Sequence, residues 1–223
     1  IALAFLPLAR LRGIRSVFIE SAAMVQGRTR TGRALRFVPG INRYTQYQDM
    51  TDGRWDYIGC VFDGFEARPV TVGRPGKVVV TVGTSTEFGF RTLIERLVDI
   101  IPPNVDVVWQ TGSTDVTGLD IDASPWIPAA NLEQQIAASD VVVAHAGCGS
   151  ALTALTQGKR PILVARQADR GEFNDNHQQE IAARLADRGL AVRAEIATLT
   201  WEHLIDAAQW TVERHQAGHR LRL

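Results

Sequence analysis

The sequence predicts an α/β fold in which a doubly wound parallel sheet forms the larger, carboxyl-terminal part of the chain. Two observations predict it. From residue 77 onward, short apolar runs rich in β-branched residues, such as KVVVTV, alternate with segments of helical periodicity. Several helical segments also end at glycine or proline, which stops a helix before the next run. Alternating strands and helices favour a parallel sheet, and such sheets bind ligands beyond the carboxyl ends of their strands.

The part before this regular half is less periodic. Apolar residues at helical spacing predict a helix over residues 1–12, and IRSVFIE predicts a buried strand over residues 14–20. A polar region rich in arginine and glycine follows, with a short strand at 43–47 and an apolar stretch at 57–62. Residues 66–76 (EARPVTVGRPG) contain two prolines and two glycines and are predicted to be a linker.

In the regular half, each apolar run is predicted to be a strand and each periodic segment a helix. The predicted strands are residues 77–82, 105–110, 126–127, 140–144, 161–165 and 190–193. The predicted helices are residues 90–101, 131–138 with Asn131 as the cap, 150–157, 174–188 and 200–216. The candidate ligand loops are therefore those that follow residues 82, 144 and 165.

Composition limits the classes of protein to consider. The 24 Lys and Arg balance the 24 Asp and Glu, so no strong field recruits nucleic acid or an anionic membrane. Cys60 and Cys148 are too few for a disulfide framework or a metal cluster, and they fit a reducing cytoplasm. The apolar run at residues 1–6 is too short to span a bilayer. Any polyanion is therefore expected to bind at a local site.

The turn AHAGCGS, between a predicted strand and a predicted helix, is the first candidate site. Gly147 and Gly149 let the backbone come close to a ligand, and the first amides of the helix present donors and a partial positive charge. Ser150 and His145 add side-chain donors, and a diphosphate uses such a set well. The alternatives are that the glycines only permit tight packing, and that His145 is a hydrogen-bonded loop histidine.

Two further loops add polar groups. One is a small, hydroxyl-rich turn suited to phosphate or sugar hydroxyls, and its alternative is an ordinary helix cap. The other opens a helix with amides and a carboxylate that can read sugar hydroxyls, and its alternative is a solvated first turn. The residues are Gly83, Thr84 and Ser85 in the first loop, and Asn176, His177, Gln178 and Gln179 in the second. If all three loops meet at one crevice, they predict a nucleotide-diphosphate-sugar site.

The motifs VVVTVGTS, DVVVAHAGCGSALTAL, GKRPILV and NDNHQQEIAARLADRG resemble the donor-binding domain of glycosyltransferase family 28, which has the GT-B fold. These motifs are especially similar to those of the catalytic subunit of the two-part GlcNAc transferase that makes dolichol-linked oligosaccharides. RQADRGEFNDNHQ is more similar to bacterial exopolysaccharide transferases. Through LARLRGIRSVFIES, TGRALRF and YTQY, residues 1–65 resemble the end of the membrane-associated companion subunit. The resemblance implies a truncated Rossmann-like acceptor domain at 1–65, a linker at 66–76 and a donor domain at 77–223.

The resemblance also implies residue roles. Gly147, Gly149 and Ser150 would cradle the donor diphosphate beside His145. The loop that begins at Gly83 would face the phosphates or the transferred sugar, and the first turn after residue 175 would contact the sugar or shape its pocket. Many relatives have a glutamate that holds the nucleotide ribose, and Thr153 occupies that position here.

Taken together, the resemblance implies transfer of a hexosyl or N-acetylhexosaminyl group from a UDP-sugar, with inversion, to a lipid-linked or saccharide acceptor. Family members of this fold need no metal or other cofactor, and Asp120 and Asp122 are interpreted as a solvated turn. The protein is expected to be cytoplasmic, with peripheral contact to the inner face of the cell membrane and no nucleic-acid partner. Because the chain opens within a helical pattern and without methionine, the general base is expected in an absent earlier segment.

Three other functions remain open from the sequence. GCGSAL resembles the dinucleotide motif of an NAD(P)-dependent oxidoreductase, although Leu152 stands where glycine or alanine is wanted and Arg166 follows the next strand. A non-catalytic nucleotide-sugar-binding subunit and a sugar-nucleotide epimerase are the others. Trp55, Trp109 and Trp126 are interpreted as core or loop packing.

Overall fold

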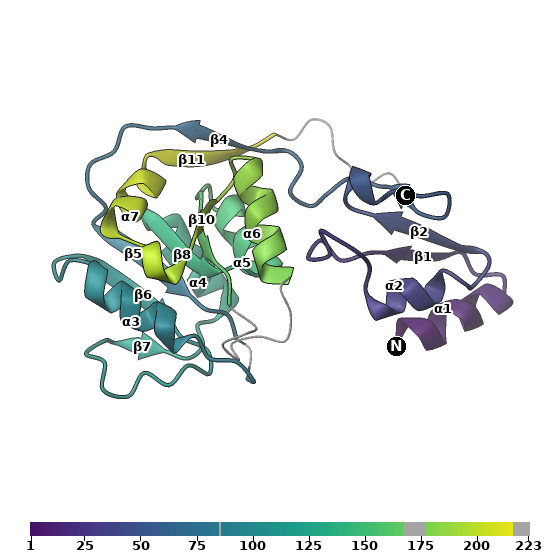
Figure 1. Ribbon diagram of the computed structural model, residues 1–223, viewed down its shortest axis with the longest axis horizontal. Helices are drawn as coiled ribbons and strands as arrows, with labels where there is room; N and C mark the ends of the chain where they lie inside the picture. The colour runs from purple at the N-terminus through teal and green to yellow at the C-terminus, as the bar shows by residue number, and fades with distance from the viewer. Residues whose placement is uncertain (85, 167–176, 216–223) are drawn as a thin grey trace. The chain divides into compact units, whose positions relative to one another are not determined.

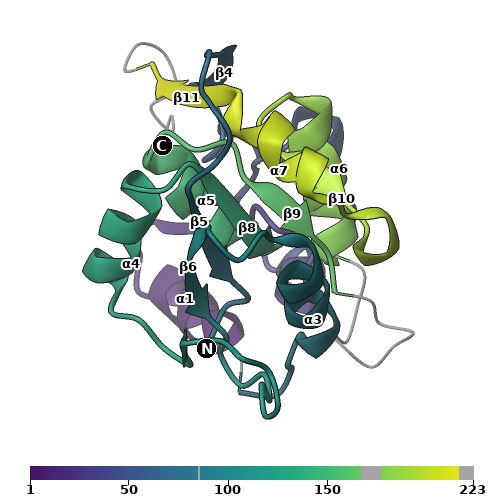
Figure 2. The same cartoon turned by 90° about the vertical axis from the view of Figure 1, so that its left-hand side faces the viewer.

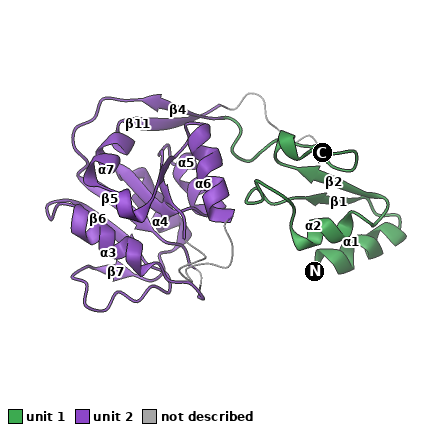
Figure 3. Ribbon diagram, viewed as in Figure 1, with its two compact units in different colours: residues 1–64, 216–223 green, residues 65–215 purple. Residues whose placement is uncertain are grey.

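The computed structural model describes residues 1–84, 86–166 and 177–215 (Figure 1). These residues form two compact units, Ile1–Gly64 and Phe65–His215, which Figure 3 shows in different colours. None of the helices in the described part of the chain has the length and apolar character that a bilayer-crossing segment needs.

The first unit is built on a small parallel sheet. Its strands lie in the order β1-β2-β3, and both pairings are parallel. The elements are α1 (Ala2–Leu11), β1 (Ser16–Ile19), α2 (Arg30–Leu35), β2 (Ile41–Thr45), the 3₁₀ helix η1 (Gln48–Met50) and β3 (Asp56–Tyr57). The helix and strand predicted at its beginning are confirmed, whereas the next strand lies two residues earlier than the predicted 43–47.

Helix α2 was not expected in the polar arginine-rich region, because six residues give little periodicity. It is held by local capping instead. The Thr29 hydroxyl accepts a hydrogen bond from the Gly32 backbone N–H at 3.0 Å, and the Glu20 carboxylate accepts one from the Thr29 N–H at 3.1 Å. The Glu20 side chain, which is buried at the end of β1, thereby ties the helix to the sheet.

The second unit is a doubly wound α/β domain, as the sequence predicts. The six strands of its main sheet are all parallel, in the order β10-β9-β8-β5-β6-β7. The strands are β5 (Lys77–Thr81), β6 (Asp106–Gln110), β7 (Ala123–Ser124), β8 (Val141–His145), β9 (Ile162–Val164) and β10 (Val192–Ala194). The direction of winding reverses between β5 and β8, so the crevice beyond their carboxyl ends is the switch point.

Helices cover both faces of this sheet. In Figure 2, α3 and α7 lie on one side of the strands and α4 and α5 on the other. The α3 side encloses the main apolar core, to which every second residue of β5 and β8 contributes. The helices are α3 (Arg91–Ile100), α4 (Ala129–Ala137), α5 (Cys148–Thr156), α6 (His177–Asp187) and α7 (Trp201–Ala208), with a 3₁₀ turn η3 (Ile196–Thr198) before the last.

The prediction of a helix over residues 200–216 is wrong in its second half. Helix α7 ends at Ala208, and the chain continues as strand β11 (Trp210–Arg214), which pairs antiparallel with β4 (Phe65–Pro69). The Val212 backbone N–H also donates to the Gly158 carbonyl at 2.9 Å. Backbone pairing with two other segments therefore overrides a helical pattern. The predicted linker 66–76 begins inside β4 and lacks regular structure only from residue 70 onward.

Several boundaries also differ from the prediction. The short strand lies at β7 and not at 126–127, and the N-cap position of α4 is Pro128 in place of Asn131. Helix α5 begins at Cys148, two residues before the predicted start. Residues 174–176 of the predicted helix lie outside the described residues.

We expect Leu97→Ala to lower the free energy of unfolding by about 2–5 kcal/mol, because a fully buried leucine would leave a cavity in the core of the second unit. Val98→Ala is the matched control on the same helix, since Val98 is 36% exposed, and should change stability by about 0.5 kcal/mol or less. Urea unfolding followed by circular dichroism measures both. Equal losses in the two variants would contradict the assigned core.

Candidate functional site

A cavity of about 500 Å³ lies beyond the carboxyl ends of the strands at the switch point. One wall carries polar side chains from the strand ends and α5, and the other carries apolar side chains from the segment before α4 and from α4 itself. Its lining includes Thr81, Gly83, Thr84, Gln110, His145, Gly149, Ser150 and Thr153 on the first wall, and Trp126, Ile127, Ala129, Leu132 and Ile136 on the second. A cavity with one apolar and one polar wall fits a ligand of the same amphipathic kind.

The amino end of α5 opens at this cavity. The residue before the helix is Gly147, and no side chain caps it. Gly149 and Ser150 in the first turn and Thr153 one turn later line the cavity. The first amides of an uncapped helix and its dipole favour an anion, so this wall can hold phosphate oxygens without a cationic side chain.

The imidazole of His145 lies between two backbone turns. A Cβ added to Gly83 would come within 2.6 Å of the ring, and one added to Gly147 would also collide with it. The Ser150 hydroxyl lies 3.5 Å from Nδ1, and the Thr81 backbone makes a hydrogen bond with the ring. The ring therefore excludes a side chain at both turns, and Gly83 also has a φ of 79°, which favours glycine independently of the ring.

The charge of His145 is set by its surroundings. Burial and, to a smaller extent, the positive charge of Arg166 together lower its pKa from 6.5 to about 4, against the opposing effect of the hydrogen bond to Thr81. The imidazole is consequently uncharged at neutral pH. A neutral imidazole has one N–H, which donates to the Thr81 backbone, so the other ring nitrogen is an acceptor at the edge of the cavity.

The two glycines of the AHAGCGS turn serve different purposes. Gly147 is required by the imidazole, whereas a Cβ at Gly149 would meet nothing within 4 Å. Gly149 is also exposed and has an ordinary helical conformation. Its lack of a side chain keeps the cavity wall open and does not relieve any contact in the fold.

The structure brings together most of the residues predicted for the first two loops. One cavity is lined by Gly83, Thr84, His145, Gly149, Ser150 and Thr153. Gly147 does not line the cavity itself but lies against the His145 imidazole, which does. Ser85 and Asn176 lie outside the described residues.

The third-loop residues that the structure describes are not among those lining this cavity. His177, Gln178 and Gln179 form the first turn of α6, and the His177 ring lies 3.8 Å from the Glu180 carboxylate. Gln178 is only 6% exposed, and its side-chain oxygen accepts a hydrogen bond from the Arg166 backbone N–H at 3.0 Å. Gln178 therefore connects α6 to the strand end beside the cavity.

Sequence reasoning missed the apolar part of the cavity lining and two polar side chains at the strand ends. Trp126 is 63% exposed and lines the cavity, so its interpretation as packing is wrong, whereas Trp55 and Trp109 are buried as expected. Thr81 and Gln110 end neighbouring strands, and the Thr81 hydroxyl donates to the Gln110 side-chain oxygen at 2.5 Å. Polar residues at the ends of two apolar runs were the available signal for this pair.

The comparisons identify the family. The family described as the glycosyltransferase family 28 C-terminal domain matches residues 77–213, which is more than half of the chain. The chain belongs to this family. No curated protein sequence matches it. The described residues contain no group of three or more His, Cys, Asp or Glu side chains placed to hold a metal ion.

Solved glycosyltransferases share the fold. The chain is 21% identical to the glycotransferase of kitacinnamycin, with a TM-score of 0.56, over 91% of this chain and 63% of that one. It is 19% identical to MurG of Acinetobacter baumannii, with a TM-score of 0.58, over 90% of this chain and 59% of that one. It is 16% identical to the spinosyn forosaminyltransferase SpnP, with a TM-score of 0.53, over 90% of this chain and 62% of that one. The chain therefore spans about three fifths of the length of these proteins. Its α/β architecture is of the GT-B type.

We expect Gly149→Ala to leave the melting temperature unchanged or slightly higher, because the new methyl group meets nothing and alanine favours a helix by up to about 1 kcal/mol. Gly147→Ala should lower the melting temperature, because its methyl group displaces the imidazole. In a His145→Ala background that loss should largely disappear. A loss of equal size in both backgrounds would show that the ring is not the reason for the glycine.

A second prediction concerns pH. An unfolded histidine takes up a proton near pH 6.5, whereas the folded chain keeps His145 uncharged down to about pH 4, so the unfolded state binds more protons between these values. The uncharged His145 therefore adds to the free energy of unfolding fully above pH 6.5. This contribution, at most about 3 kcal/mol, is lost as the pH falls toward 4. Urea unfolding of the wild type and His145→Asn across this range measures the difference. The same dependence of the free energy of unfolding on pH in both proteins would contradict this prediction.

Proposed function

We propose that the chain binds a UDP-sugar and forms the donor side of an enzyme that transfers a hexosyl or N-acetylhexosaminyl group, with inversion, to a lipid-linked or saccharide acceptor. One observation carries the proposal: a single cavity at the switch point joins an apolar wall to the open amino end of a helix. A nucleotide-sugar has the matching parts, because a flat base is joined to a diphosphate through a ribose.

The two walls suggest how the donor lies. The uracil of the donor would contact Trp126 and Ile127, since an exposed indole offers a face for stacking. The diphosphate would lie at Gly149 and Ser150, where the helix dipole is positive. The ribose would then be near Thr153, whose hydroxyl replaces the carboxylate that many relatives have at this position.

The chemistry needs a stabilised leaving group. In the transfer, the bond between the anomeric carbon and the diphosphate oxygen breaks, and the acceptor oxygen bonds to the opposite face of that carbon. Negative charge develops on the departing diphosphate, where the first amides of α5 can donate hydrogen bonds. The acceptor proton passes to a base, and we assign that base to no described residue.

The acceptor side rests on the resemblance of residues 1–65 to a membrane-associated subunit and of the third loop to exopolysaccharide transferases. A lipid-linked acceptor and peripheral contact with the inner face of a membrane follow from that likeness. Polysaccharide or glycolipid synthesis is the role that unites these features.

The oxidoreductase alternative is weaker in this geometry. An NADP-binding site needs a cation free to meet the 2′-phosphate, and the Arg166 guanidinium is buried and bonded to two backbone carbonyls. The non-catalytic alternative shares the donor site and differs only in the absence of turnover.

The test is calorimetric titration of the whole chain with UDP, UDP-GlcNAc, UDP-glucose, UDP-glucuronate and NADPH. Gly149→Asp places a carboxylate at the phosphate wall, so we expect it to weaken UDP binding at least about tenfold. Trp126→Ala should weaken it about tenfold through lost stacking.

The matched controls separate charge from fold. Gly73→Asp adds the same charge where a Cβ meets nothing within 4 Å, and Gly149→Ala adds volume without charge. Both should bind UDP much more tightly than Gly149→Asp. Binding of NADPH without any uridine nucleotide, or no nucleotide binding by the folded chain, would refute the proposal.

A further inference from the structure

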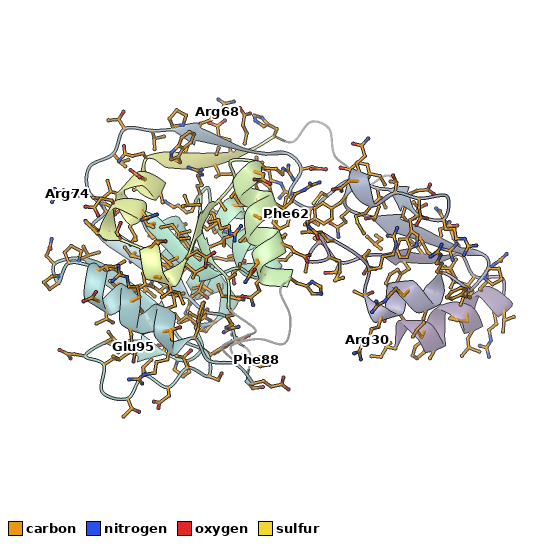
Figure 4. The ribbon with its side chains drawn as sticks, viewed as in Figure 1. Arg30, Phe62, Arg68, Arg74, Phe88 and Glu95 are labelled. Carbon is orange, nitrogen blue, oxygen red and sulfur yellow. The ribbon has the colours of Figure 1, made fainter. Side chains whose placement is uncertain are left out.

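A buried arginine lies behind the cavity. Arg166 follows β9 and is only 2% exposed. One nitrogen of its guanidinium donates to the Val82 carbonyl at 2.7 Å and to the Phe88 carbonyl at 3.1 Å (Phe88 is labelled in Figure 4). The side chain therefore extends from the end of β9, past β8, to the loop after β5.

These two bonds close one loop. Val82 and Phe88 flank Gly83 and Thr84, which line the cavity. A carbonyl at each end of the loop is bound by the same planar group, so the ends are fixed relative to each other. The nitrogen of a lysine ammonium lies one bond closer to the backbone than this guanidinium nitrogen, so a lysine at position 166 would fall short of the two carbonyls.

The arginine is itself fixed from two directions. Its backbone N–H donates to the buried side chain of Gln178 on α6. Its guanidinium carbon lies 5.5 Å from the centre of the Phe90 ring. Burying a charge is costly, and the hydrogen bonds to the two carbonyls and the contact with the ring offset part of that cost.

The same charge acts on the imidazole of the neighbouring strand. Of the charged side chains that the structure describes, Arg166 is the one whose field adds to burial in lowering the pKa of His145. A fixed cation behind the ring also raises the positive potential at the helix end where we place the diphosphate.

We propose that Arg166 is a positioning residue of this donor site, which ties the ends of the loop after β5 together and supplies a fixed positive charge beside His145. The proposal rests on the proposed function only for the identity of the ligand. The loop and the ring are held before any ligand arrives, so both effects are measurable in the unliganded chain.

The test compares three variants of the whole chain by nuclear magnetic resonance without ligand. Arg166→Met removes charge and hydrogen bonds, and we expect the titration midpoint of His145 to rise by about one pH unit. Amide exchange at Gly83 and Thr84 should become at least about tenfold faster. Arg166→Lys should restore the His145 midpoint but not the slow exchange. Arg160→Met, at the other end of β9, is the control and should change neither quantity.

A wild-type midpoint and wild-type exchange in Arg166→Met would overturn the proposal, and so would equal changes in Arg160→Met. If Arg166→Met does not fold, Arg166→Lys decides the matter, because unchanged exchange in that variant contradicts the loop contact. Calorimetry with UDP then separates the two proposals. Wild-type chain that binds no UDP refutes the donor site, whereas the titration and exchange data still decide the role of Arg166.

Discussion

The pairing of β5 with β8 is the constraint on which the rest of the site depends. Thr81 pairs with Ala144, so two turns from distant parts of the sequence meet at one edge of the sheet. The imidazole of His145 fills the space between those turns, and each turn must lack a side chain to receive it. The position of the cavity and the burial of the ring both depend on this adjacency.

The second unit could be predicted well from the sequence because its signals are local. Apolar runs, glycine stops and the AHAGCGS turn each lie within a few residues, and the reversal of winding placed the right loops at one edge. Trp126, Gln110 and Arg166 could not be assigned in the same way. Their roles depend on which strands are neighbours, and strand order is not a property of any short segment.

The errors at element ends have the same origin. β11 carries a helical pattern, but its backbone groups find partners on β4 and at Gly158. Helix α2 is short and polar, and it depends on the Glu20 carboxylate from another element. In the third loop, Gln178 was expected to contact the sugar or shape its pocket, but its side chain bonds the Arg166 backbone and is not part of the cavity lining. In each case a long-range hydrogen bond outweighs the local pattern.

The β4–β11 pairing has a practical consequence for dividing the chain. The family match begins at residue 77, and an isolated domain cut there would lack β4. The edge of β11 would then carry unpaired N–H and C=O groups along its length, and such exposed strand edges promote self-association. A fragment that starts at Phe65 and extends through His215 keeps the two strands together, together with the bond between His215 and Glu66. The solubility of such fragments therefore depends on the β4–β11 pair, which does not line the ligand cavity.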